Sequence, residues 1–302
     1  MINKKNSNQS WIGIFFSLSA IWGGAFFFVK ITVFEFGFVG TSFLRIFFGM
    51  LILIPGLFFN NNFQYLKNNW KKIFFIGLFI AAIPWTTYSF ALQYISAGLA
   101  SVINATTPMF GAIVASIWLK EKLNSMKILG LFLGFLGIFM LSHDDIHLEI
   151  DNSTVGILAA LVSTTCYGFG ACYIRKYLST IPPTATSAGS LISASIVLLP
   201  FTFFYIPDTM PSISAWGSIF FLGFICSGYA YYLYFGLVKK AGATVGLLVT
   251  FLIPVFAILY GYIFLNEKVT LWMLFSALII VFGTSLVIGI FDRKKIFNIS
   301  LN

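Results

Sequence analysis

The sequence predicts an all-α integral membrane protein with ten transmembrane helices, arranged as two inverted five-helix repeats with both termini in the cytoplasm. Three observations lead there: the composition, ten long apolar runs and a weak internal repeat. Of the 302 residues, 59% are hydrophobic and 9% are charged, and the mean hydropathy is +0.94. Soluble chains carry about 25% charged residues, so this chain has too little charge to cover a water-exposed surface.

Ten apolar runs have the length that a helix needs to cross the hydrocarbon core, about 20 residues. They cover residues 11–33, 38–59, 73–92, 98–119, 126–142, 155–173, 184–205, 213–238, 245–265 and 271–291. The first run is too long for a signal-peptide core and shows no cleavage site, so we expect it to be retained. Strands of an outer-membrane barrel would alternate apolar and polar residues. These runs do not, so helices are predicted.

Two regions of the chain allow a more specific prediction. The third and fourth runs are separated only by residues 93–97, which implies a tight hairpin. The fifth run is the shortest, and its Gly130, Gly134 and Gly137 would let a neighbouring helix approach closely.

The basic residues predict the orientation. The net charge is +9, which in a soluble protein would suggest nucleic acid. Here the basic residues lie in short loops between apolar runs, so we expect no nucleic-acid partner. If the N-terminus is cytoplasmic, fifteen of the 18 Lys and Arg residues fall on the cytoplasmic side, as the positive-inside rule requires.

The sequence shows no sign of a metal or cofactor. The three cysteines lie in apolar runs without disulfide or metal spacing. His143 and His147 flank an acidic pair in the outer loop, but nothing orients them, so a solvated loop is predicted. No phosphate-binding Gly-rich loop is present, and neither histidine lies in a span, so we expect no enzyme.

Sliding the chain on itself by 145 or 146 residues reveals a repeat. The aligned pairs are Trp22 with Tyr167, Gly23 with Gly168, Lys30 with Arg175, Pro108 with Pro254, Glu121 with Glu267 and Gly137 with Gly283. Because each unit has five helices, the second unit enters the membrane upside down. Inverted repeats are typical of transporters, whose halves rock about a site near the midplane. The predicted segments are a cytoplasmic tail (1–10), a first repeat (11–142), an external acidic linker (143–154), a second repeat (155–291) and a cytoplasmic tail (292–302).

The motifs of both repeats resemble a known family. Residues 91–101, Pro108 and residues 119–123 have their counterparts in residues 234–243, Pro254 and residues 265–270. This order and spacing resembles the EamA-type branch of the drug/metabolite transporter superfamily. The resemblance implies a ten-helix carrier for amino acids, nucleosides or related metabolites, usually an exporter in bacteria. It also implies a central cavity lined by both repeats, with the last helix pairs at the periphery.

Polar residues within the spans are candidates for a substrate site. Ser101, Asn104 and Thr107 follow one face of the fourth run, next to Pro108, which frees a carbonyl. Thr250 and Pro254 hold the matching places in the ninth run. Such residues either line a cavity or hold helices together. Aromatic candidates within the spans, which form either a ligand wall or ordinary packing, are Trp22, Trp85, Tyr88, Tyr167, Tyr229 and Tyr232.

Charged residues near the spans suggest structural or gating roles. Arg45 lies within the second run and either neutralises a substrate carboxylate or ties helix-end carbonyls or Glu35 together; we favour the structural role. Lys30 is an anchor near the outer surface or, with its equivalent Arg175, a matched gate. Glu121 and Glu267 end their helices next to lysines and are predicted to cap or pair within the fold.

The predicted function is secondary transport of a small polar metabolite, with an amino acid or a derivative, exported across a bacterial inner membrane, as the leading hypothesis. An importer or exchanger of a nucleotide-like metabolite such as S-adenosylmethionine is the alternative, and an intramembrane enzyme or a channel is more distant. No acid lies in the middle of a span, which favours facilitated transport or exchange over proton coupling. The expected partners are the lipid bilayer, a small-molecule substrate and a possible second copy in a homodimer.

Overall fold

The structure, a computed structural model, describes residues 5–143, 152–207, 209–241 and 243–289. Within these ranges the chain forms helices and turns without a strand, which confirms the all-helical prediction. The acids of the predicted linker, His147 and all of the predicted C-terminal tail lie outside the described residues.

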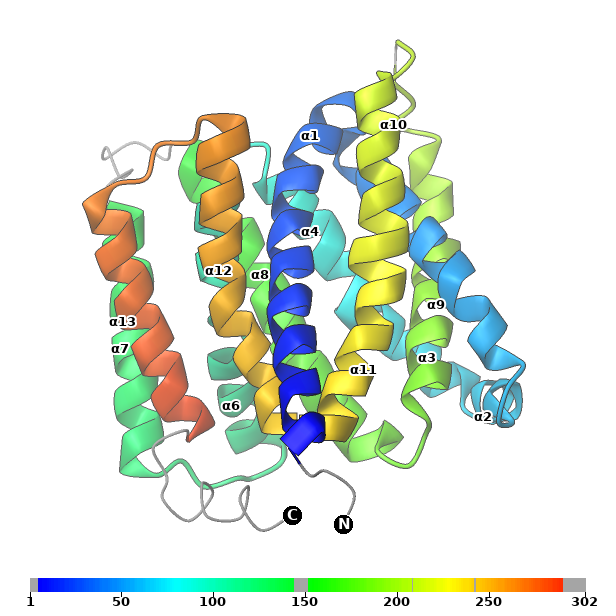
Figure 1. The fold of residues 1–302 in the computed structure, drawn as a ribbon, viewed down its shortest axis with the longest axis horizontal. Helices are drawn as coiled ribbons and strands as arrows, with labels where there is room; N and C mark the ends of the chain where they lie inside the picture. Colours follow the sequence, from blue (N-terminus) through cyan, green and yellow to red (C-terminus); the bar gives the residue numbers. More distant parts are fainter. Residues whose placement is uncertain (1–4, 144–151, 208, 242, 290–302) are drawn as a thin grey trace.

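The first half of the chain forms α1 (Lys5–Leu57), α2 (Asn62–Asn68), α3 (Trp70–Gly77), η1 (Leu78–Ala82), α4 (Ile83–Ala91), α5 (Ala97–Asn104), α6 (Thr107–Trp118) and α7 (Ser125–His143). The second half forms α8 (Asn152–Tyr173), η2 (Ile174–Leu178), α9 (Pro183–Thr202), α10 (Ile213–Phe220), η3 (Phe221–Tyr229), α11 (Ala230–Ala241), α12 (Ala243–Leu265) and α13 (Leu271–Ile288). The elements labelled η are π-helical turns. Figure 1 shows one bundle, in which the start of α1 and the end of α13 lie at the same end.

Helix α1 contains the first two predicted runs, joined at Gly37. This residue has φ 67° and ψ 168°, a conformation that glycine adopts readily because it has no Cβ. The chain turns back there, and the second half of α1 descends toward α2 (Figure 1). The apolar part, Trp11–Leu57, has 47 residues, about twice the length of one crossing.

The remaining predicted runs also have helices. Within the described ranges, seven helices including Trp11–Leu57 are long and apolar enough to cross a membrane, and Ser125–Met140 and Val249–Leu265 are shorter apolar helices. Each of the ten runs therefore coincides with one helix, with two or three consecutive helical elements, or with a half of α1. The number that cross the bilayer, and the side on which the termini lie, stay predictions.

The last helices of the two halves, α7 and α13, pack against each other at one edge of the bundle (Figure 1). A Cβ on Gly130 would lie 2.5 Å from the carbonyl oxygen of Gly283, and a Cβ on Gly137 would lie 2.6 Å from Ile280. These glycines therefore permit the close helix approach that the sequence predicts. Neither α7 nor α13 contributes a residue to the described wall of the central cavity.

The central interface shows the two-fold repeat in three dimensions. Helix α1 packs against α12, and the equivalent helix α8 packs against α6. A Cβ on Gly23 would lie 2.6 Å from Cβ of Phe256, and a Cβ on Gly168 would lie 3.0 Å from Cβ of Phe110. Phe110 and Phe256 are themselves equivalent at the 146-residue offset. Equivalent glycines thus admit equivalent phenylalanines, and each contact joins one repeat to the other.

Candidate functional site

A cavity of about 280 Å³ lies between the two repeats. Its walls come from α1, α4, α5, α6 and the turn after α4 in the first repeat, and from α8, η3, α11 and α12 in the second. Ligand pockets commonly measure about 300–1,000 Å³, so this one suits a small molecule. The lining residues are Trp22, Ala25, Phe26, Val29, Arg45, Trp85, Tyr88, Leu92, Asn104, Thr107, Tyr167, Cys226, Tyr231, Tyr234, Gly246, Thr250 and Ile253.

The aromatic walls of the cavity follow the repeat. Trp22 lies against Tyr234 with ring centroids 5.5 Å apart, and the equivalent residues Tyr167 and Tyr88 lie 6.3 Å apart. Phe26 meets Tyr88 edge to face at 5.6 Å. Each repeat therefore contributes to the wall an aromatic residue of its first helix and a tyrosine of its third predicted run, Tyr88 or Tyr234. The cavity thus has a largely apolar surface with hydroxyl groups at defined points.

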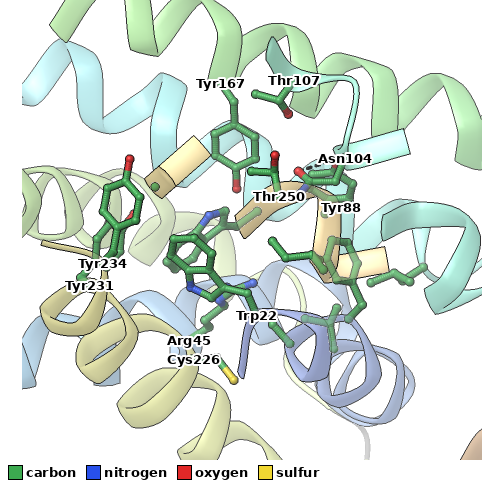
Figure 2. A pocket seen from close by; sticks show the side chains of 17 residues that line it. Trp22, Arg45, Tyr88, Asn104, Thr107, Tyr167, Cys226, Tyr231, Tyr234 and Thr250 are labelled. Atoms are coloured by element: carbon green, nitrogen blue, oxygen red, sulfur yellow. Dashed lines mark hydrogen bonds between the residues drawn. The ribbon is translucent and has the colours of Figure 1, made fainter. Parts of the chain in front are cut away.

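One end of the cavity is polar and lies where the fourth helical segment of the first repeat is broken. Helix α5 ends at Asn104, and α6 begins at Thr107. Pro108 has no N–H, so the Asn104 carbonyl lacks its usual helical donor. The Tyr88 hydroxyl donates to Asn104 Oδ1 at 3.2 Å, while Thr107 Oγ1 is buried without a hydrogen-bond partner among the described residues. Figure 2 shows Asn104, Thr107 and Thr250 gathered at this end.

The opposite end of the cavity holds Arg45 and Cys226 (Figure 2). The guanidinium carbon of Arg45 lies 3.9 Å from the centroid of the Trp85 ring, a cation–π contact. Arg45 Nε donates to Ser227 Oγ at 3.0 Å. The expected link to Glu35 is wrong, because Glu35 instead accepts hydrogen bonds from the backbone N–H and the hydroxyl of Ser212.

The structure places eight of the residues singled out by sequence in the cavity wall. They are Trp22, Arg45, Trp85, Tyr88, Asn104, Thr107, Tyr167 and Thr250. Three others lie elsewhere. Ser101 is fully buried and its hydroxyl donates to the Gly98 carbonyl at 2.6 Å. Tyr229 and Tyr232 do stack on each other, but their side chains face outward from the bundle, with 46% and 72% of their surface exposed.

The sequence reasoning missed Tyr231 and Tyr234, which replace Tyr229 and Tyr232 in the cavity. The signal was present, because the 146-residue offset that aligns Pro108 with Pro254 also aligns Trp85 with Tyr231 and Tyr88 with Tyr234. The same offset aligns Asn104 with Thr250. Phe26 and Cys226 had no comparable signal, since both lie in runs rich in similar apolar residues.

The predicted gating and capping residues lie at the two ends of the interface between repeats. Lys30 Nζ donates to the Ile95 carbonyl at 2.8 Å, and Glu267 accepts from the backbone N–H groups of Ala97 and Gly98. At the other end, Glu121 forms an ion pair with Arg175. Pro254 lies inside α12, which continues through it without a break.

No group of three or more His, Cys, Asp or Glu side chains gathers within the described part of the chain in a way that could hold a metal ion. The three cysteines are free and buried. The cavity wall itself contains aromatic, hydroxyl, amide and guanidinium groups, which can bind a polar organic molecule.

Two similar helical halves that enclose a small cavity between apolar helices define a membrane carrier. The chain belongs to the EamA-like transporter family, which matches residues 9–143 and again residues 154–289. It is thus a multi-pass membrane protein and a transporter of a small molecule.

Several relatives are similar over much of their length. The uncharacterized transporter YoaV of Bacillus subtilis (strain 168) is 25% identical over 284 residues, which is 93% of this chain and 97% of that one. The uncharacterized transporter YvbV of the same organism is 30% identical, over 74% of this chain and 73% of that one. A crystal structure of a protein 18% identical in sequence superposes with a TM-score of 0.67, covering 94% of this chain and 99% of that one, which shows the fold alone.

Proposed function

We propose that this transporter exports an amino acid or an amino-acid derivative across a bacterial cytoplasmic membrane by alternating access. The observation that carries the proposal is the cavity shared by the two repeats, with a guanidinium at one end and an amide with hydroxyls at the other. A small molecule with polar groups at both ends and an apolar body matches this distribution. The direction, export, rests on the family resemblance.

The placement of the cavity supports alternating access. Its walls combine residues from both repeats, so a rocking motion of one repeat against the other would change its access without dismantling either half. The close contacts at Gly23 and Gly168 provide two equivalent pivots between the repeats. We infer that the substrate binds in the cavity between the repeats, and that the contacts at Gly23 and Gly168 are kept while the repeats move.

We propose that transport is facilitated or occurs by exchange, so that the gradient of the substrate or of the exchanged molecule drives it. Within the part of the chain that the structure describes, no Asp, Glu or His lines the cavity, and these are the usual proton carriers inside membranes. Glu267, which lies at the α4–α5 hairpin, is the acid that we would test first as a proton carrier. If a pH gradient drives transport, and Glu267→Gln abolishes that dependence, proton coupling replaces this part of the proposal.

Metabolite profiling tests the function and identifies the substrate in the same experiment. Cells and medium would be compared for a bacterial host that expresses wild type, Asn104→Leu or Trp22→Ala at matched membrane levels. Tyr232→Ala is the matched control, since this aromatic faces outward. We expect an amino acid to accumulate in the medium with wild type and with the control only. Uptake of S-adenosylmethionine would support the alternative, and unchanged profiles in all strains would contradict transport of any metabolite in that host.

A further inference from the structure

We propose that Arg45 is the substrate anchor and binds the carboxylate of the transported molecule, so that the transporter accepts zwitterions and monoanions and rejects net cations. This inference rests on the proposed function and names the substrate class of the same cavity. It revises the structural role that the sequence alone favours for Arg45.

The charge balance of the cavity carries the first step. Among the described residues that line the cavity, Arg45 is the one that carries a charge. Within the described ranges the only ion pair joins Glu121 and Arg175, so no carboxylate of those ranges neutralises Arg45. A guanidinium stays protonated in proteins, and a charge that is half-buried in a largely apolar wall is costly without a counter-ion. A bound anion would remove that cost, which gives the cavity a strong preference for a negative group at this end.

The geometry of Arg45 carries the second step. The Trp85 ring supports one face of the guanidinium, and Ser227 Oγ takes the Nε hydrogen. The Ser227 hydroxyl in turn donates to the Leu222 carbonyl at 3.1 Å, within the π-helical segment η3. These contacts fix the plane of the guanidinium but use only one of its five N–H groups. Its remaining N–H groups form a fork that matches the two oxygens of a carboxylate.

The contact between Arg45 and Ser227 has no counterpart in the other repeat. π-helical turns often mark functional sites, and η3 brings Ser227 toward Arg45. In the second repeat the residue equivalent to Arg45 at the 145-residue offset is Ser190, which does not line the cavity. Among the described lining residues the anion site therefore has no counterpart in the second repeat, so a substrate binds in one orientation.

The far end of the cavity carries the third step. Asn104 Oδ1 and the Asn104 carbonyl, at the carboxyl end of α5, are acceptors and lie at the negative end of a helix dipole. An ammonium or hydroxyl group suits this end, and the aromatic wall suits an apolar body between the two. A polyamine or S-adenosylmethionine would bring net positive charge to Arg45, and no acid among the described lining residues would offset it.

Binding to purified transporter tests the anchor directly. The probes are L-leucine, L-phenylalanine, L-threonine and L-lactate, each beside its carboxamide, in which an uncharged group replaces the carboxylate. We expect wild type to bind at least one acid about tenfold or more tightly than its amide, the factor that corresponds to one or two charge-assisted hydrogen bonds. In Arg45→Gln this acid-over-amide ratio should fall to about one, because amide binding is retained and acid binding weakens to the level of the amide.

Two further variants keep the result interpretable. Arg45→Lys retains the charge without the fork and should keep part of the ratio, which also covers the case in which Arg45→Gln fails to fold. Ser227→Ala releases Nε and should weaken acids about threefold while sparing amides. Lys71→Gln, which removes an exposed charge on α3 outside the cavity, is the control and should leave the ratio unchanged.

The outcomes separate the anchor from the proposed function. If only L-lactate binds, the anchor stands and the amino-acid assignment fails. If amides bind as tightly as acids, if Arg45→Gln keeps the ratio, or if wild type binds none of the acids, the anchor is overturned. Export of an uncharged metabolite in the profiling experiment would also overturn it while leaving the protein a transporter.

Discussion

The two ends of the interface between repeats use equivalent residues but are held differently. At the α4–α5 hairpin, Lys30 donates to the Ile95 carbonyl, and Glu267 accepts from the N–H groups of Ala97 and Gly98 at 2.8 and 3.4 Å. Lys30 also experiences the charge of Glu267. At the other end the equivalent residues, Arg175 and Glu121, bind each other, and the Arg175 side chain is 66% exposed.

This difference indicates how the two halves can exchange roles. At the 146-residue offset Ala97 and Gly98 correspond to Ala243 and Thr244, where α12 begins. We infer from these hydrogen bonds that the Glu267 end is the more tightly closed one. The Glu121 end is held by an ion pair with the exposed Arg175, and by the stacking of Trp118 on Phe169. In the opposite state of a rocking carrier, we expect Glu121 to leave Arg175 and cap the start of α12.

The largest expected effect comes from filling the equivalent pivots. A Cβ at residue 168 would lie 2.6 Å from the backbone nitrogen of Gly111, so Gly168→Val forces the backbones apart. We expect Gly168→Val and Gly23→Val each to lose about 3 kcal/mol or more of stability, the upper end of overpacking costs. Thermal unfolding in detergent and the yield of monodisperse protein measure this.

Gly217→Val is the control for these two variants, since a Cβ there has nothing within 4 Å. It should unfold close to wild type. If Gly23→Val and Gly168→Val differ greatly from each other, the two pivots are not equivalent and the two-fold comparison breaks.

The second prediction compares the broken fourth segment with its continuous counterpart. Pro108→Ala restores an N–H that can join α5 to α6, and this would turn Asn104 and Thr107 away from their present positions. We expect the transport rate to fall about fivefold or more, whereas Pro254→Ala, within the continuous α12, should stay within about twofold. Initial rates of the exported metabolite at matched protein levels decide this, and equal losses would show that the break has no special role.

Most of the fold could be predicted from the sequence, because apolar length and periodicity report directly on helices in a bilayer. The hairpin after α4, the close glycines of α7 and the repeat register all follow from local patterns. The apolar pattern locates the bend at Gly37 only approximately, as a gap between two runs. In the structure α1 continues on both sides of it.

The candidate site could be predicted only in part, because membership in a cavity depends on which face of a helix turns inward. The π-helical turn η3 shifts that face, since each π turn inserts a residue into the helical register. Tyr231 and Tyr234 thereby point inward, where the simple pairing of Tyr229 with Tyr232 suggested otherwise. The contacts of Arg45 with Ser227 and Trp85 join three segments that are distant in the sequence, so no local pattern predicts them.

The smallest expected effect concerns the two glutamates. Glu267→Gln removes a carboxylate from the N-terminus of α5 and should cost about 1–2 kcal/mol of stability. Glu121→Gln breaks an ion pair whose arginine is exposed, and should cost less than about 1 kcal/mol. Denaturant or thermal unfolding of both variants under one condition provides the comparison, and a larger loss for Glu121→Gln would reverse our assignment of the tightly closed end.

Cross-linking tests the exchange of roles between the repeats most directly. Glu267→Cys with Ala97→Cys, and Glu121→Cys with Ala243→Cys, would be treated with a short thiol cross-linker in membranes, beside each single variant as a control for the native cysteines. We predict that both pairs cross-link during transport, that each cross-link stops transport, and that substrate shifts the balance between them. If transport proceeds while the Glu121–Ala243 pair never cross-links, the two repeats do not close opposite ends in turn, and the account is contradicted.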